Sequence, residues 1–164
     1  MRRVAFLSFL FGLLAISQAN ADAVFFRYGL GFGAPQQNGR GEIKWFSLGI
    51  EQDHKAPWVT QAELGVIADQ KDYLGRRSGL FLGTTVGPKM QLGPVQTRYL
   101  WGVAWISTTD ALLSSHMQFT HDLTLGLYDR KSGLSLGYKH ISNAGITLPN
   151  RGRDFVTLRA ETYF

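Results

Sequence analysis

The sequence contains no cysteine, and after its first 21 residues it has no run of about 18 apolar residues. The first absence excludes disulfides, thiol catalysis and thiolate metal sites. The second excludes membrane-spanning helices. Helix caps followed by an apolar period of about 3.6 residues are scarce, whereas glycine and aromatic residues are frequent. This combination predicts an all-β protein.

The N-terminus has the pattern of a secretory signal peptide. Arginines precede an apolar run from Val4 to Ile16, and a small-x-small cleavage site ends at Ala21. A retained N-terminal anchor is the alternative, but the run is shorter than the about 20 residues that cross a bilayer. We therefore expect residues 1–21 to be a signal peptide and residues 22–164 to form one domain.

The chain carries only a modest excess of positive charge, with 17 basic and 12 acidic side chains. Loss of Arg2 and Arg3 with the signal peptide would leave 15 basic side chains. They do not gather into a basic patch, so no nucleic-acid partner is expected. Four arginines fall in two predicted loops, where they are either solvated or in contact with anionic lipid headgroups: Arg76, Arg77, Arg151 and Arg153.

The remaining sequence divides into segments that alternate in polarity like membrane β-strands. Apolar residues share one face of each strand, and glycine, polar and charged residues share the other. A soluble sandwich would bury the apolar face, whereas a barrel in lipid exposes it and pairs its charges inside. The expected interior charges are Glu63, Arg98, Asp122, Arg159 and Glu161. The expected strands span residues 23–33, 42–51, 58–69, 79–88, 95–107, 117–128, 133–143 and 154–164.

These strands predict an eight-stranded antiparallel outer-membrane β-barrel, too narrow for a solute pore. The strand at 95–107 fits least well, because both of its faces are apolar. The terminal residue, Phe164, resembles the assembly signal of bacterial outer-membrane barrels. Short periplasmic turns are expected at 51–57, 87–94 and 129–133, and external loops at 34–41, 70–78, 107–116 and 144–153.

A polar group lies where this pattern predicts a lipid-facing surface. His140 and Ser142 continue the outward row of Leu134, Leu136 and Tyr138, at the external end of a strand. A serine becomes a nucleophile when a base accepts its proton and a third group orients that base. Taken singly, the histidine is more often structural, and the serine can simply start a turn.

The following strand could supply the third group. Asp154 shares the outward parity and could hold the His140 imidazole across a hairpin, or could instead pair with Arg151 or Arg153. Asn143, Asn150 and the backbone N–H of Gly145 could then stabilise an oxyanion, or could serve only the turn.

The segment Gly137-Tyr-Lys-His-Ile-Ser-Asn-Ala-Gly145, followed by Asn150-x-Gly152-x-Asp154, resembles the PagL family of outer-membrane lipid A 3-O-deacylases. The resemblance implies that His140 is the general base, Ser142 the nucleophile and Asp154 the acid. It also assigns Asn143, Gly145 and Asn150 to the turn and oxyanion region. Asp154 departs from the family, which commonly has Glu, so its strand must lie closer to His140.

We therefore expect an outer-membrane serine esterase that acts on lipopolysaccharide in the outer leaflet of a Gram-negative bacterium. No cofactor or metal is expected, since His54, His116 and His121 have no ligand spacing and His121 lacks a spaced partner. A homodimer is among the assemblies that the sequence allows. The alternatives are a non-enzymatic structural or adhesion barrel and a soluble lipid-carrying barrel.

Overall fold

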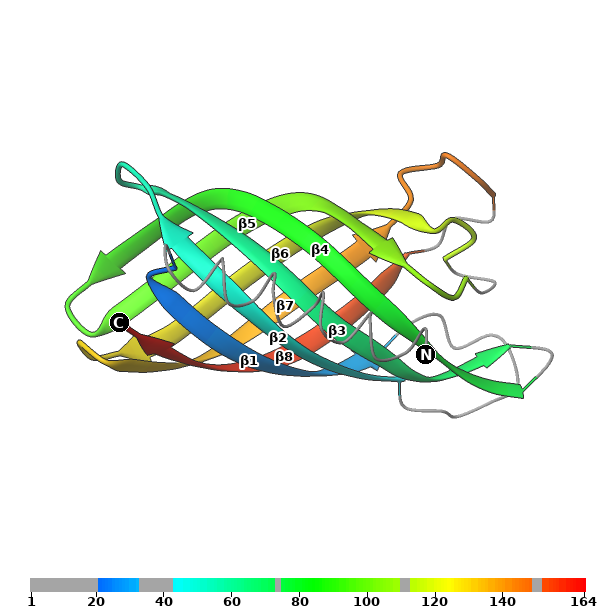
Figure 1. Ribbon diagram of the computed structural model, residues 1–164, viewed down its shortest axis with the longest axis horizontal. Helices are drawn as coiled ribbons and strands as arrows, with labels where there is room; N and C mark the ends of the chain where they lie inside the picture. The colour runs from blue at the N-terminus through cyan, green and yellow to red at the C-terminus, as the bar shows by residue number, and fades with distance from the viewer. Residues whose placement is uncertain (1–20, 33–42, 73–74, 110–112, 149–151) are drawn as a thin grey trace, which may run out of the picture.

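The computed structural model describes residues 21–32, 43–72, 75–109, 113–148 and 152–164. Within these residues, eight antiparallel strands close into one barrel in sequence order, with β8 paired to β1 (Figure 1). No helix in these ranges is long and apolar enough to cross a membrane. The strands are β1 Ala23–Phe32, β2 Ile43–Asp53, β3 Trp58–Asp72, β4 Gly75–Leu92, β5 Val95–Ile106, β6 Met117–Tyr128, β7 Ser132–Ser142 and β8 Arg153–Tyr163.

The alternation of side chains puts apolar residues outside the barrel. On β6, Leu123, Leu125 and Leu127 are exposed, whereas the neighbouring Asp122 and Thr124 are buried. Successive side chains of a strand point to opposite faces, so a period of two in polarity becomes an apolar exterior and a polar interior. The predicted barrel, with its apolar face outward, is confirmed.

Ion pairs fill the polar part of the interior. Glu51 lies 2.9 Å from Arg98 and 2.8 Å from Arg159, while Arg27 lies 3.3 Å from Glu63 and 2.5 Å from Asp122. Arg98 also contacts Glu161 at 2.9 Å. The five charges predicted to pair inside the barrel do so. Arg27, Glu51, Lys89 and Lys139 extend the network, in which each of these charges lies against at least one charge of opposite sign.

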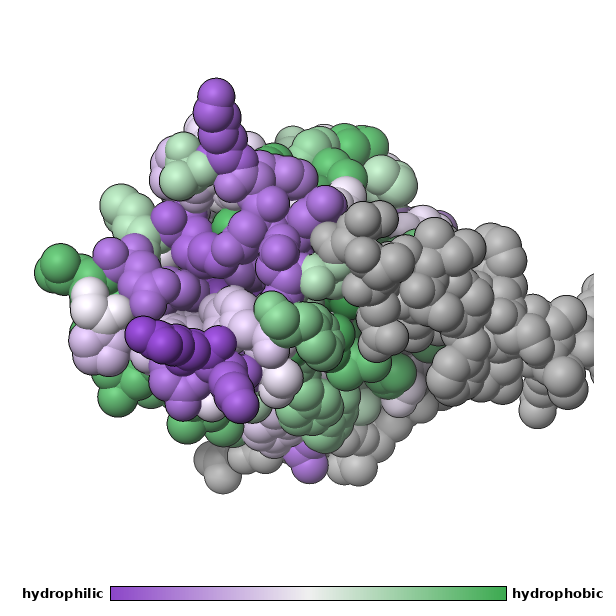
Figure 2. All heavy atoms as spheres, turned by 60° about the vertical axis from the view of Figure 1, so that its left-hand side comes forward, coloured by the Kyte–Doolittle hydropathy of each residue, from purple (hydrophilic) through white to green (hydrophobic). Residues whose placement is uncertain are grey.

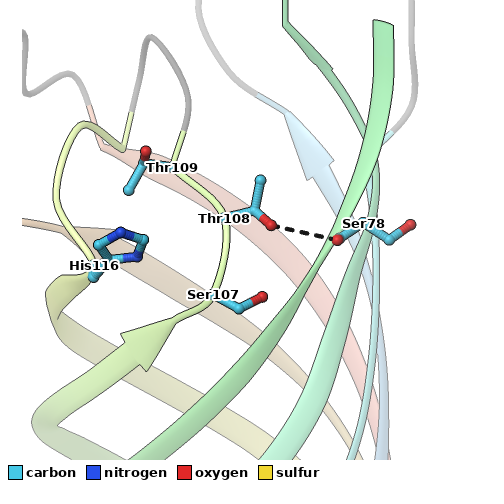
Figure 3. A pocket seen from close by; sticks show the side chains of 5 residues that line it. All are labelled: Ser78, Ser107, Thr108, Thr109 and His116. Atoms are coloured by element: carbon cyan, nitrogen blue, oxygen red, sulfur yellow. Dashed lines mark hydrogen bonds between the residues drawn. The ribbon is translucent and has the colours of Figure 1, made fainter.

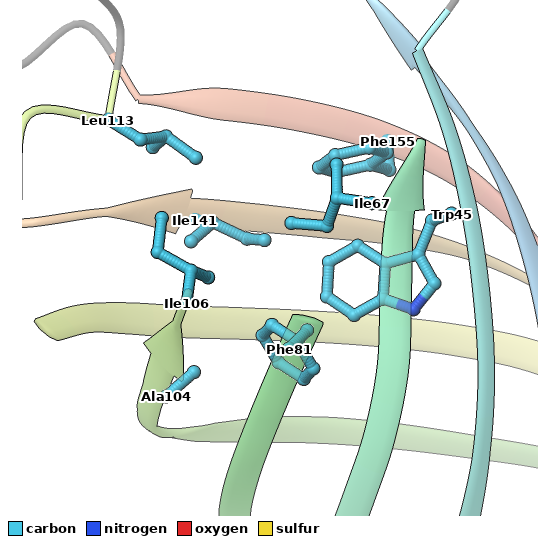
Figure 4. Packing of buried hydrophobic residues seen from close by; sticks show 8 residues of the cluster. All are labelled: Trp45, Ile67, Phe81, Ala104, Ile106, Leu113, Ile141 and Phe155. Atoms are coloured by element: carbon cyan, nitrogen blue, oxygen red, sulfur yellow. The ribbon is translucent and has the colours of Figure 1, made fainter. Parts of the chain in front are cut away.

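An apolar cluster occupies the loop end of the interior (Figure 4). The cluster explains why both faces of β5 are apolar: Ala104 and Ile106 join the cluster inside the barrel, while Trp105 faces outward. The Lys139 ammonium lies 4.6 Å from the ring centre of Trp45 and so connects the cluster to the ion pairs. The members are Trp45, Ile67, Phe81, Ala104, Ile106, Leu113, Ile141 and Phe155.

Two predicted connections are wrong because the strands continue through them. β3 and β4 remain paired to Asp72 and Gly75 across a register shift, so most of the loop expected at 70–78 is a hairpin. β4 also runs to Leu92, and the turn expected at 87–94 shrinks to a tight turn at Gly93, whose φ is +60°. Backbone pairing favours extension wherever cross-strand neighbours remain in register.

The predicted placement of arginines in loops is also corrected. Arg76 and Arg77 belong to β4, and Arg153 begins β8 with its side chain only 3% exposed. Burial of Arg153 argues against both a solvated position and a lipid-headgroup contact for it. Arg151 lies outside the described residues.

The tight turns, the start of β1 and the end of β8 all lie at one end of the barrel (Figure 1). Hydrophilic residues gather over this end, with hydrophobic residues on its flanks (Figure 2). In its β6–β7 turn, the backbone N–H groups of Lys131 and Ser132 donate to the Asp129 carboxylate and lower the pKa of Asp129. The β7–β8 loop, and with it the predicted site, lies at the opposite end.

Candidate active site

The predicted nucleophile and base lie side by side on the outward face of β7. Lys139 and Ile141 point into the barrel, so the alternation directs Tyr138, His140 and Ser142 outward. Pairing between β7 and β8 ends at Ile141, one residue before Ser142. Ser142 is therefore at the rim of the barrel, where a substrate can approach from the loop side.

Asp154 lies directly opposite His140 in the β7–β8 register. Its Oδ1 is 2.7 Å from His140 Nδ1, and the two side chains are 30% and 32% exposed. This contact occupies Nδ1 and leaves Nε2 as the nitrogen that can exchange a proton with another group. Arg153 points to the other face of β8, so Asp154 faces the histidine and not this arginine.

Tyr138 supplies a second contact to the same carboxylate. Its hydroxyl donates a hydrogen bond to Asp154 Oδ1, the oxygen that also contacts His140. The sequence pattern placed Tyr138 only in the apolar row. Its parity with His140, two residues along the strand, was the signal that could have identified this contact. The tyrosine and histidine together fix the orientation of the carboxylate.

Gly152 closes one side of the imidazole. Its φ is +67°, and a Cβ added there would lie 2.6 Å from His140 Cε1 and 3.1 Å from His140 Nε2. Only glycine combines this backbone conformation with such a close approach. The glycine of the sequence motif therefore sets the space available to the base.

The predicted turn and oxyanion residues have different placements. The Asn143 side-chain amide is buried and donates to Ser114 Oγ, Thr147 O and Thr147 Oγ1 at 2.8–3.0 Å. The Gly145 N–H donates to Asn143 Oδ1 at 2.9 Å. These N–H groups are engaged within the β7–β8 loop and with Ser114 of the β5–β6 connection, which favours a structural role in the turn for these two residues. Asn150 lies outside the described residues.

Ser142 does not form a hydrogen bond with His140. Among the described residues, its Oγ makes no hydrogen bond. Residues i and i+2 of a strand are separated by about 6.7 Å along its axis, so contact needs rotamers that turn the two side chains together. Catalytic hydrogen bonds commonly tighten when substrate binds. The structure thus pairs His140 with Asp154 and leaves Ser142 adjacent.

The other histidines lie elsewhere, with one exception. His121 faces outward on β6 directly opposite His140, and their ring centres are 6.5 Å apart. The sequence shows no partner spaced along the chain from His121, whereas the sheet places His140 directly across from it. Within the described ranges, no group of three or more His, Asp or Glu side chains could hold a metal ion.

A polar hollow of about 420 Å³ opens elsewhere at the loop end, between β4 and the segment that follows β5 (Figure 3). Two of its hydroxyl groups already make structural contacts, since Thr108 donates to the Ser78 carbonyl and Ser107 accepts from the Leu80 N–H. None of the predicted site residues lines it. Its lining residues are Ser78, Ser107, Thr108, Thr109 and His116.

The fold and the residues on β7 and β8 define a small outer-membrane-type barrel with a serine, a histidine and a carboxylate on its outward surface. The family described as lipid A 3-O-deacylase (PagL) matches residues 22–162. The chain belongs to this family, whose activity is that of an ester hydrolase acting on lipid A in the outer membrane. A search of curated protein sequences gives no significant match.

Solved structures support the same fold. The outer membrane enzyme PagL is 17% identical, with a TM-score of 0.62 over 85% of this chain and 99% of its own. Neisserial surface protein A is 9% identical, with a TM-score of 0.57 over 87% and 95% of the two chains. The Yersinia pestis attachment invasion locus protein Ail is 9% identical, with a TM-score of 0.51 over 86% and 94%. At these identities the likeness extends to the fold alone.

Proposed function

We propose that this protein removes the 3-O-linked hydroxyacyl chain of lipid A by a serine mechanism, with its site facing the outer leaflet. The observation that carries the proposal is the 2.7 Å contact between His140 Nδ1 and Asp154 Oδ1 beside Ser142. Such a contact orients an imidazole for proton transfer through its other nitrogen. Membership in a lipid A deacylase family supports the substrate class.

In the first half of the reaction, Ser142 Oγ attacks the ester carbonyl carbon while His140 Nε2 accepts the hydroxyl proton. Asp154 stabilises the imidazolium that forms. Collapse of the tetrahedral intermediate breaks the bond to the sugar oxygen, which takes the proton from His140. An acyl group then remains on Ser142. Water, deprotonated by His140, attacks this acyl-enzyme. The bond to Ser142 Oγ then breaks, Ser142 takes the proton back from His140, and the hydroxy fatty acid is released.

The outward row of β7 suits an acyl substrate. Leu134 and Leu136 are exposed below Tyr138 and His140, in the direction away from the loop end. An acyl chain in the outer leaflet could lie along them and present its ester at Ser142 without leaving the membrane. Because lipid tails are as apolar as leucine, this row would position the chain by van der Waals packing and not by removing it from water.

The proposed orientation of the barrel in the outer membrane follows from export through a signal peptide. Cleavage of a signal peptide at residues 1–21 would leave the start of β1 in the periplasm, together with the tight turns. Odd-numbered strands would then run outward, and β7 would carry Ser142 to the outer leaflet, where lipopolysaccharide resides. A homodimer would be compatible with this arrangement.

A structural or adhesion role is the alternative, because the fold alone is shared with barrels such as Neisserial surface protein A. Mass spectrometry of lipid A from cells with and without the protein separates the two. Loss of one 3-hydroxyacyl chain supports the deacylase, and unchanged lipid A supports the non-enzymatic barrel. Protease accessibility of the β7–β8 loop in intact cells tests the orientation separately.

A further inference from the structure

A second histidine interrupts the apolar exterior beside the proposed site. His121 is exposed on β6, and its neighbours on that face, Phe119 and Leu123, are exposed and apolar. Polar side chains are unfavourable on the lipid-facing side of a membrane barrel and tend to mark function. His121 lies opposite His140, so this unfavourable polar side chain is next to the proposed catalytic residues.

The Tyr99 hydroxyl beside His121 is compatible with the tautomer that carries its proton on Nε2. Tyr99 stacks on its ring at 6.4 Å between centres, and the Tyr99 hydroxyl is 3.4 Å from His121 Nδ1. A tyrosine hydroxyl that donates to Nδ1 leaves the proton of a neutral imidazole on Nε2. His121 would then present an N–H donor to the outward surface. The 6.5 Å between the His121 and His140 ring centres leaves the two rings without a mutual hydrogen bond.

The proposed reaction needs such a donor. An oxyanion of an acyl-transfer intermediate is stabilised by preorganised N–H groups. Of the three residues predicted to stabilise the oxyanion, Asn143 and Gly145 use N–H groups in contacts with Ser114, Thr147 and the Asn143 side-chain carbonyl oxygen, and Asn150 lies outside the described residues. Ser142 lies diagonally across the β6–β7 pair from His121, since its direct partner is Phe119. Diagonal neighbours on a sheet are about 7–8 Å apart, within reach of long side chains.

We propose that His121 Nε2–H donates a hydrogen bond to the ester carbonyl oxygen of the substrate as Ser142 attacks. This inference rests on the proposed deacylase function. When the Ser142 Oγ–carbon bond forms, the carbonyl electron pair moves to the oxygen that His121 binds. The serine proton goes to His140, and His121 keeps its own. When the bond to the sugar oxygen breaks, the electron pair returns and the carbonyl is restored.

The test uses purified, refolded barrels in detergent with lipid A as substrate, and counts only folded protein by heat-modifiable gel mobility. His121→Gln retains an N–H donor near the Nε2 position, whereas His121→Leu and His121→Phe remove it. Loss of one oxyanion donor typically lowers kcat about 10²–10³-fold. We expect kcat to fall by this factor in His121→Leu and His121→Phe, with little change in KM. His121→Gln should retain much of the wild-type kcat. Tyr99→Phe should cause a smaller loss.

His54→Leu is the matched control, because His54 lies in a turn at the other end and bonds Thr60 Oγ1. It should leave turnover unchanged. The inference is overturned if folded His121→Leu and His121→Phe turn over like the wild type, if their loss lies in KM alone, or if Gln is as impaired as Leu. Inactivity of the wild-type barrel on lipid A would instead refute the proposed function itself.

Discussion

Replacing Gly152 with alanine should impair catalysis far more than folding. The added Cβ would meet His140 Cε1 at 2.6 Å, whereas an ordinary contact begins at 3.4 Å. The imidazole must therefore move by most of an ångström or turn away from Asp154. A misplacement of about 1 Å in a reacting group can cost about 10²-fold in rate. The positive φ of +67° adds about 1–2 kcal/mol of backbone strain in the folded state.

Gly93→Ala separates the two effects. Gly93 has a similar φ of +60°, but its added Cβ would meet nothing within 4 Å, and it lies in a turn at the far end of the barrel. Both variants should lower the unfolding midpoint, measured by the shift of gel mobility with temperature, by similar amounts. Lipid A deacylation by folded protein should fall about 100-fold for Gly152→Ala alone. Equal activities of the two variants would refute the steric argument.

Four further substitutions, at three positions, test the acid, its tyrosine contact and the ion pairs of the interior. Asp154→Asn should keep the fold and lose much activity in a detergent assay, while Asp154→Glu should retain part of it; near wild-type turnover by Asn would leave a Ser–His dyad. Tyr138→Phe removes one contact to Asp154 Oδ1, so kcat should fall severalfold with KM nearly constant, and an unchanged kcat would reduce Tyr138 to packing. Glu51→Gln leaves Arg98 and Arg159 short of a buried counter-charge, which should destabilise the barrel by about 3–5 kcal/mol, read as a lower thermal midpoint.

The fold was largely predictable because a barrel in lipid leaves its pattern on every strand. A period of two in Leu123, Leu125 and Leu127 specifies which face is outward, and closure follows from the lack of water to satisfy open edges. Strand ends were less predictable. The extension of β4 to Leu92 depends on cross-strand pairing with β5, which no local pattern encodes.

The site was predictable only in part. Spacing places His140 and Ser142 on one face, and parity across the hairpin adds Asp154, but the sequence pattern did not reveal the neighbour on β6. His121 became visible as a partner of His140 only through the β6–β7 register, which depends on the length of the turn between them. Likewise, the motif indicated Gly152, and only the three-dimensional structure explains its approach to the imidazole.

The central claim is that Ser142 attacks the lipid A ester with His140 as its base. The most direct measurement is release of 3-hydroxy fatty acid from lipid A by purified, refolded Ser142→Ala, quantified by mass spectrometry against wild-type barrel of equal folded content. A small residue replaces another at the rim, so assembly should be preserved. Turnover should fall by about three orders of magnitude or more, and His140→Asn combined with it should be scarcely worse. Retention of most of the wild-type turnover by folded Ser142→Ala would contradict the serine mechanism.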